Sequence, residues 1–314
     1  MIEVMHLTKK YGDHVAVDDL SFRVEKGQIY GFLGPNGAGK STTMNIMTGY
    51  LAATEGTVLI DGKDIQKEPQ EAKKLIGYLP ELPPVYAEMT VGEYLRFVAE
   101  LKKIPKEERQ KQISEVMEMT KITDKENRLI KNLSKGYKQR VGLAQAILGY
   151  PAVIILDEPT VGLDPKQIIE IRDLIRELGK NHTVILSSHI LSEVSAVCDH
   201  IMIIAHGRLV ASDSPEGLQK LMSGSAELKL TVKGSFEDAE RAIHRLPNVE
   251  GVENSGTAQD GCVQITIFSK ENVDIREDVF YALAAAKLPI MSMQRMEKSL
   301  EDIFLELTQE KEEE

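Results

Sequence analysis

A glycine-rich stretch, GPNGAGKST, occupies residues 34–42 and matches the phosphate-binding pattern G-x-x-x-x-G-K-[ST]. Its glycines let backbone N–H groups curve around phosphate oxygens, and a helix that begins there adds a partial positive charge. We expect Lys40 to reach the β- and γ-phosphates of a nucleotide and Ser41 to ligate Mg²⁺ through its hydroxyl. A turn without a ligand is the alternative, but the strand pattern before the motif and the helical pattern after it favour a nucleotide site. The predicted nucleotide contacts are Gly34, Pro35, Asn36, Gly37, Ala38, Gly39, Lys40, Ser41 and Thr42.

Two adjacent carboxylates, Asp157 and Glu158, follow the apolar stretch 153–156. In hydrolysing enzymes with such a phosphate loop, the first carboxylate holds magnesium directly or through water. The second is then placed to orient or deprotonate the attacking water, so we predict that Glu158 is a catalytic base. An exposed acidic pair at a strand end is the alternative, and the upstream phosphate loop makes the catalytic interpretation the better one.

Eight residues that begin at Leu133, LSKGYKQR, lie between the phosphate loop and the Asp-Glu strand. Ser134 is the kind of residue that caps a helix, and the helical pattern after it ends near Gly149. Many proteins carry a phosphate loop, but far fewer place an LSxG-type helix start at this point of the chain. The order of these three motifs is therefore the most specific signal in the sequence.

In this order, the motifs resemble those of the nucleotide-binding subunit of an ATP-binding cassette (ABC) transporter, over roughly residues 2–220. The resemblance implies that ATP and Mg²⁺ bind, that Tyr11 stacks on adenine, and that His189 contacts the γ-phosphate. It implies that Ser134 and Gly136 bind the γ-phosphate held by a partner subunit, and that Asp164 lies at the dimer seam. The predicted catalytic residues are then Glu158, His189 and Lys40. The implied enzyme is an ATPase that works as a pair.

Three of these roles have simpler alternatives. Tyr11 precedes a glycine and could be an ordinary turn aromatic. His189 follows an apolar strand and could be a core histidine. Asp164 could cap the helix that begins at Pro165, with or without a contact to a partner.

The sequence departs from the family pattern at two places. The family usually carries LSGGQ, and here Lys135 and Tyr137 replace the third and fifth residues, while the serine and the second glycine remain. The glutamine that the family places after the next strand is Glu81 here, in IGYLPE. A carboxylate can still ligate magnesium but adds negative charge beside ATP. Our hypothesis is that Glu81, with Ser41 and Asp157, is a magnesium ligand that raises the metal requirement.

Alternating strand and helix patterns position these motifs and predict an α/β fold, a mostly parallel sheet with helices on both faces. Strands are predicted at 2–8, 15–17, 21–24, 28–33, 57–60, 75–79, 153–156, 183–187 and 201–204. Residues 85–148 are predicted to be helical, and Thr90 with Glu93 forms a capping box. The resemblance implies an ABC cassette with a parallel core, an antiparallel β subdomain and this helical subdomain, over residues 1–222.

A short Ser/Gly linker near residues 222–225 precedes a predicted C-terminal domain at 226–309. Its pattern is strand 227–232, helix 236–245, strands 249–253 and 263–268, helix 273–286, strand 291–296 and helix 300–307. This order resembles a ferredoxin-like α+β unit. A regulatory, a dimerising and an inert role all remain open. The ending MEKSLEDIFLELT resembles the tail of exporter-type ATPase subunits, which work with separately encoded permeases.

The composition limits the setting and the partners. With 38 basic and 49 acidic residues the formal net charge is −11, which disfavours nucleic-acid binding. Two distant cysteines, Cys198 and Cys262, favour a reducing compartment over a disulfide framework. No signal peptide or apolar run that could span a bilayer is recognised, so a polytopic permease would have to supply the membrane part. We expect a peripheral location on the cytoplasmic face of the membrane.

The sequence lacks features expected of other proteins with a phosphate loop. A soluble ABC ATPase of translation usually carries two cassettes, and one of DNA repair inserts a long coiled coil; neither feature is found. A P-loop kinase or small GTPase needs no LSxG helix, and no NKxD tetrapeptide for guanine is evident. The sequence thus favours a transporter ATPase. The resemblance of the tail favours export over import, and a homodimer and a heterodimer remain equally open.

Overall fold

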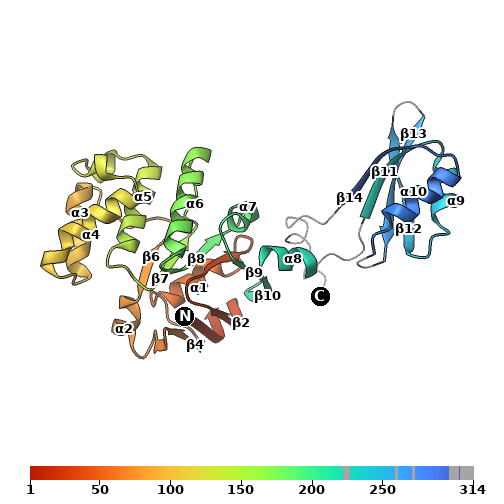
Figure 1. Ribbon diagram of the computed structural model, residues 1–314. Helices are drawn as coiled ribbons and strands as arrows, with labels where there is room; N and C mark the ends of the chain where they lie inside the picture. Colours follow the sequence, from red (N-terminus) through yellow and green to blue (C-terminus); the bar gives the residue numbers. More distant parts are fainter. Residues whose placement is uncertain (222–226, 259–260, 271–272, 297–303, 305–314) are drawn as a thin grey trace. The chain divides into compact units, whose positions relative to one another are not determined.

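The computed structural model describes residues 1–221, 227–258, 261–270, 273–296 and 304. Its contacts divide the chain into two compact units, Met1–Pro215 and Glu216–Ile303, with Phe304 grouped with the first (Figure 1). Each unit has its own apolar core.

A six-stranded sheet forms the centre of the first unit, in the order β10-β9-β3-β8-β7-β6. The strands are β3 (Ile29–Leu33), β6 (Ile76–Leu79), β7 (Val153–Asp157), β8 (Thr183–Ser188), β9 (His200–Ala205) and β10 (Arg208–Asp213). Five of them run parallel, and β10 pairs antiparallel with β9. Every residue of β3, β7 and β8 is buried, as expected for parallel strands covered on both faces. The predicted parallel sheet is confirmed.

A second, antiparallel sheet has the order β2-β1-β4-β5. Its strands are β1 (Ile2–Tyr11), β2 (His14–Val24), β4 (Glu55–Ile60) and β5 (Lys63–Asp64). The prediction of two short strands at 15–17 and 21–24 is wrong, because one continuous strand, β2, covers both. The break in the pattern reflects irregular pairing with β1, where Asp19 adopts a positive φ of 48°.

Some helices flank the parallel sheet, and others form a separate group in the segment of the chain that joins β6 to β7 (Figure 1). The flanking helices are α1 (Lys40–Met47), α2 (Pro69–Lys74), α6 (Pro165–Gly179) and α7 (Leu191–Ser195). The separate group holds α3 (Val91–Leu101), α4 (Lys106–Met119) and α5 (Lys135–Ile147). The predicted capping box is present at α3: the Thr90 hydroxyl accepts the Glu93 N–H, and the Glu93 carboxylate accepts the Thr90 N–H.

The second unit begins within α8 (Pro215–Leu221) and contains an antiparallel sheet, in the order β12-β13-β11-β14. Its elements are β11 (Glu227–Lys233), α9 (Phe236–Ile243), β12 (Val249–Ala258), β13 (Cys262–Ser269), α10 (Arg276–Ala285) and β14 (Ile290–Met296). Alternate residues of β11, such as Leu228 and Leu230, share an apolar cluster with Val279 and Leu283 of α10. The predicted helix at 300–307 lies outside the described residues apart from Phe304. Among the described helices, none has the length and apolar character needed to cross a membrane.

Candidate active site

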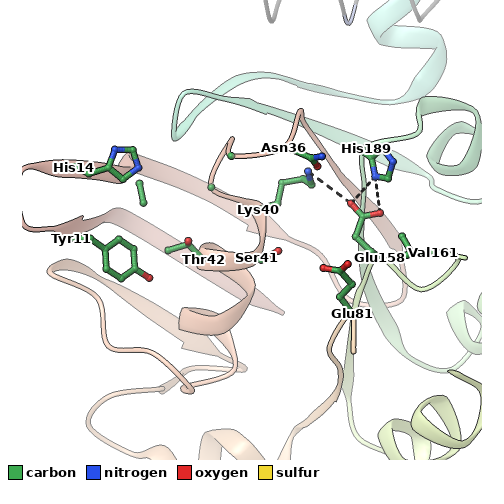
Figure 2. A pocket seen from close by; sticks show the side chains of 13 residues that line it. Tyr11, His14, Asn36, Lys40, Ser41, Thr42, Glu81, Glu158, Val161 and His189 are labelled. Atoms are coloured by element: carbon green, nitrogen blue, oxygen red, sulfur yellow. Dashed lines mark hydrogen bonds and ion pairs between the residues drawn. The ribbon is translucent and has the colours of Figure 1, made fainter. Parts of the chain in front are cut away.

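A cavity of about 450 Å³ opens beside the loop that joins β3 to α1 (Figure 2). It is lined by Tyr11, His14, Ala16, Asn36, Gly37, Gly39, Lys40, Ser41, Thr42, Glu81, Glu158, Val161 and His189. These residues come from the antiparallel sheet, from the start of α1 and from the loops after β3, β6, β7 and β8. Because parallel strands bring their carboxyl ends to one edge, residues distant in the sequence meet at this cavity.

The glycine loop needs glycine at two of its positions. A Cβ atom at Gly34 would lie 2.4 Å from the Ile204 carbonyl oxygen, and one at Gly39 would lie 2.5 Å from the Ala16 carbonyl oxygen. Gly39 also has a φ of 99°. It precedes α1 and gives that helix no side-chain cap, so the N–H groups of the first turn are available to an anion. The loop therefore has the backbone geometry of a phosphate cradle.

Lys40 is the buried cation of the cavity. Its side chain is 6% exposed, and Nζ donates to the carbonyl oxygens of Gly34 at 2.7 Å and Pro35 at 3.2 Å. Nζ also lies 3.9 Å from Glu158 Oε1 (Figure 2). Burial lowers the Lys40 pKa, and the carboxylates of Glu158, Asp157 and Glu81 oppose that change. The ammonium group is thus held beside three carboxylates at the foot of the glycine loop.

Side-chain oxygens of the kind that ligate Mg²⁺ lie next to Lys40. Ser41 Oγ is 3.4 Å from Asp157 Oδ1, and the Glu81 side chain lines the same cavity. The described residues contain no cluster of three or more His, Cys, Asp or Glu residues that could hold a metal. A hydroxyl and one or two carboxylates fit Mg²⁺, which usually keeps several waters and takes further ligands from phosphates. The donor set suits a magnesium–nucleotide complex and not an all-protein metal cage.

Glu158 and His189 form a hydrogen-bonded pair at the far side of the cavity (Figure 2). His189 Nδ1 lies 3.1 Å and 3.0 Å from the two carboxylate oxygens of Glu158. Burial raises the Glu158 pKa, while His189 and Lys40 oppose the rise and Asp157 adds to it. The His189 side chain is 42% exposed, so it is not a core histidine. A buried carboxylate with a raised pKa is the arrangement expected of a general base.

Tyr11 and His14 form the other end of the cavity (Figure 2). The two residues are direct partners across the β1–β2 hairpin. The Tyr11 ring is about half exposed, and Lys9 Nζ lies 5.2 Å from its centroid. The half-exposed tyrosine therefore lies at the end of the cavity opposite Glu158.

Ser134, Gly136 and Asp164 do not line this cavity. Ser134 caps α5, where its hydroxyl accepts the Tyr137 N–H at 3.5 Å, and Asp164 caps α6, where its carboxylate accepts the Gln167 N–H at 2.9 Å. A Cβ atom at Gly136 would lie 2.4 Å from Gln167 Oε1, so the two helix starts pack closely. The chain thus brings the glycine loop and the Asp-Glu pair together and leaves the LSKG residues elsewhere.

Sequence reasoning missed four residues at or beside the cavity. His14, Ala16 and Val161 line it, and Ser187 Oγ donates to Asp157 Oδ1 from the next strand. His14 could have been found from its place across a two-residue turn from Tyr11. Ser187 had a weaker signal: two serines end the apolar strand TVILSS.

Comparison with known proteins places this geometry in a family. The sequence profile of the ABC transporter family matches residues 17–161. The uncharacterized ABC transporter ATP-binding protein YhcH of Bacillus subtilis (strain 168) is 37% identical over 317 residues, which cover 100% of this chain and 98% of the relative. The bacitracin transport ATP-binding protein BcrA of Bacillus licheniformis is 35% identical, over 98% of this chain and 97% of the relative.

A solved structure shares the fold of the cassette. The dimeric, post-hydrolysis structure of the ATP-binding cassette MJ0796 with ADP and Pi matches with a TM-score of 0.62 and 26% sequence identity. The match covers 68% of this chain and 98% of that chain. The relatives match nearly end to end, and the cassette fold agrees with the cavity and its phosphate loop. The chain therefore belongs to the ABC transporter ATP-binding proteins: it is an ATP-binding, ATP-hydrolysing subunit of an ABC transporter.

Proposed function

We propose that this subunit hydrolyses magnesium–ATP at a site shared by two ATPase subunits, and that it thereby drives export through a separately encoded permease. One observation carries the proposal. The cavity gathers Lys40, Ser41 and Glu158, but the LSKG helix start at Ser134 lies outside it. A site that lacks one of its expected anion-binding elements needs a second subunit to supply it.

In the proposed complex, ATP lies along the cavity from Tyr11 to the glycine loop. Tyr11 offers its aromatic face to the adenine ring, and the glycine loop donates N–H groups to the phosphates. Lys40 takes the β- and γ-phosphates in place of its present carbonyl partners. Magnesium would be held by Ser41, Asp157 and Glu81, and it would neutralise charge on the phosphate oxygens.

Hydrolysis uses the other end of the cavity. Glu158 accepts a proton from the attacking water, and its raised pKa suits that step better than an ordinary carboxyl would. His189 hydrogen-bonds the same carboxylate and is half exposed, so it can hold Glu158 in place and still reach the γ-phosphate. General-base catalysis of this kind contributes about 100- to 10,000-fold in rate.

Pairing completes the phosphate site. The start of α5 has Ser134 and Lys135 at the surface, and a helix N-terminus favours an anion. Contact between this surface and the γ-phosphate in a second subunit gives ATP a higher affinity for the closed pair than for separate subunits. ATP binding then closes the dimer and hydrolysis opens it. Asp164, exposed at the start of α6, lies at the seam in this arrangement.

A groove of about 650 Å³ provides a place for the permease. On one side it is lined by Lys73 of α2 and Ile76 of β6. On the other side it is lined by Leu101, Ile104 and Glu108 of the helical group. Leu101 is 64% exposed there. A short cytoplasmic helix of a membrane partner, with one apolar face and mixed charges beside it, matches this lining. Closure of the dimer would then move the groove and pull on the permease.

Transport of a cargo is supported by the bacitracin transport relative. Export is the direction proposed, because the sequence after Met296 resembles the tail of exporter ATPases. Association with a permease would place the subunit at the cytoplasmic face of the membrane.

Purification from native membranes tests this proposal. The tagged protein, extracted in mild detergent, should bring down one polytopic membrane protein in stoichiometric amount. Leu101→Asp should abolish that recovery without loss of ATP hydrolysis by the isolated subunit, whereas Ile169→Asp, at an exposed apolar residue of α6 outside the groove, should not. A wholly soluble protein that recovers ribosomes, DNA complexes or no partner would contradict the transport function.

A further inference from the structure

Ser187 is a buried hydroxyl between the two acidic residues of the site. It is fully buried near the end of β8. Ser187 Oγ donates to Asp157 Oδ1 at 2.5 Å and accepts the Glu158 N–H at 3.0 Å. A hydroxyl has one proton and two lone pairs, so it can do both at once. One side chain therefore contacts both acidic residues.

Strand register explains why Ser187 meets this pair. β7 and β8 are parallel, and Asp157 of β7 is the register partner of Ser187. At the next residue, Glu158, the chain leaves the sheet with a φ of 48°, a left-handed conformation that residues other than glycine rarely adopt. The Glu158 N–H then takes Ser187 Oγ as its acceptor. A buried N–H in this position would otherwise be without a partner.

The same contacts fix where the two carboxylates point. Asp157 Oδ1, the atom that accepts from Ser187, also lies 3.4 Å from Ser41 Oγ, on the proposed magnesium side. The left-handed turn at Glu158 directs its carboxylate to His189 and Lys40 (Figure 2). Loss of the Ser187 hydroxyl would remove the shorter of these two contacts of Asp157 Oδ1 and would leave the Glu158 N–H without this acceptor.

We propose that Ser187 is a positioning residue for hydrolysis: it holds Asp157 and the backbone of Glu158 in the geometry that the reaction needs. This inference rests on the proposed role of Glu158 as the base. Ser187 does not line the cavity, so it acts through its two neighbours and not on ATP itself. It therefore affects the chemical step more than the binding of ATP.

A matched control exists on the same strand. Thr183 begins β8 at the end away from the site, is 3% exposed, and its hydroxyl accepts the Gly27 N–H at 3.1 Å. Thr183→Val removes a buried hydroxyl that accepts a backbone N–H, as Ser187→Ala does, but touches neither acidic residue. A purely structural role predicts the same consequences for both variants.

The test measures kcat, KM for ATP and melting temperature for the full chain. Ser187→Ala should lower kcat about 10- to 100-fold, the usual cost of removing a group that orients a ligating or reacting side chain, and change KM little. Thr183→Val should melt earlier than the parent but keep its kcat. Ser187→Thr should restore most of the activity; if the extra methyl group lowers its melting temperature, Ser187→Cys, with a weaker donor, should give an intermediate kcat.

Glu158→Gln separates the two proposals. If it abolishes hydrolysis, Ser187→Ala added to it should cause little further loss, because residues that act through one group are not additive. An unchanged kcat in Ser187→Ala, or an equal loss in Thr183→Val, would overturn the role of Ser187 alone. Normal hydrolysis by Glu158→Gln would instead overturn the role of Glu158 as the base, on which this inference rests.

Discussion

The two helix starts of the cassette that we propose to bind phosphate differ in how complete they are. At α1, the glycine loop provides no side-chain cap, and Lys40, Asp157 and Glu158 are all buried beside it. At α5, Ser134 is exposed and already caps the helix with its own hydroxyl. Ser134 does not line the cavity that contains Lys40 and Glu158. In the proposed function, the first is one half of the catalytic site, and the second is a surface that completes the site of another subunit.

This difference has a physical reason. Catalytic groups in a buried half are pre-organised by the fold, since neighbouring strands and hydrogen bonds such as that of Glu158 to Ser187 hold them before any ligand binds. The exposed half can approach a phosphate only when a second subunit docks. The proposed ATPase cycle follows from this division, because ATP favours the docked state and its hydrolysis removes that preference.

The largest effect should come from removing the proposed base from the buried half of the site. Glu158→Gln removes the proposed base but keeps its size, so hydrolysis should fall about 100-fold or more while ATP still binds. Because ATP is then not consumed, the variant should accumulate as a dimer with ATP and magnesium, measured by light scattering. Rapid hydrolysis in this variant would mean that another group activates the water.

A charge at the exposed half should have the next largest effect. Aspartate is as good a helix cap as serine, so Ser134→Asp should leave α5 stable, but its charge would repel the partner's γ-phosphate. Hydrolysis should fall at least about 10-fold with ATP binding to the monomer unchanged. Ser134→Asn, a neutral cap, is the control and should be much more active. Equal activity of the two variants would exclude a phosphate at this surface.

The pH dependence of hydrolysis should report the ionisation of Glu158. Its pKa is raised, so activity should fall on acidification at a higher pH than an ordinary carboxyl would give, and should rise as Glu158 loses its proton. His189 lowers the Glu158 pKa; its removal in His189→Ala should therefore move the acidic limb to still higher pH. A limb that moves to lower pH in this variant would contradict the assigned base.

The smallest effect is expected at Glu81. Its carboxylate lines the cavity with Ser41, and its negative charge contributes to the environment of Lys40. Glu81→Gln should keep an oxygen ligand but remove a negative charge beside the triphosphate that Mg²⁺ must balance, so the concentration of Mg²⁺ for half-maximal hydrolysis should fall several-fold. Titration of activity with Mg²⁺ at fixed ATP measures this change. An unchanged magnesium dependence would count against Glu81 as a ligand.

The sequence was sufficient for features that depend on local order. Residues 34–42 and the pair Asp157–Glu158 are contiguous motifs, and the structure brings six residues of the loop and Glu158 to one cavity with His189, while Asp157 lies 3.4 Å from Ser41 Oγ without lining it. Ser187 could not be assigned in the same way, because its role depends on which residue of β7 it faces, and register between strands is a tertiary property. The prediction of two short strands in the region of β2 was wrong for a related reason. Irregular pairing with β1 interrupts the alternating pattern of what is one long strand.

The most direct test of a site shared between subunits is a mixture of two inactive variants. Glu158→Gln has a normal Ser134 surface, and Ser134→Asp has a normal glycine loop and base. In a mixed dimer, the loop of the second chain meets the normal Ser134 of the first, so one complete site forms. The account predicts ATP hydrolysis well above the sum of the two variants measured alone. Hydrolysis that only equals that sum, at concentrations where mixed dimers are detected, would contradict the shared site.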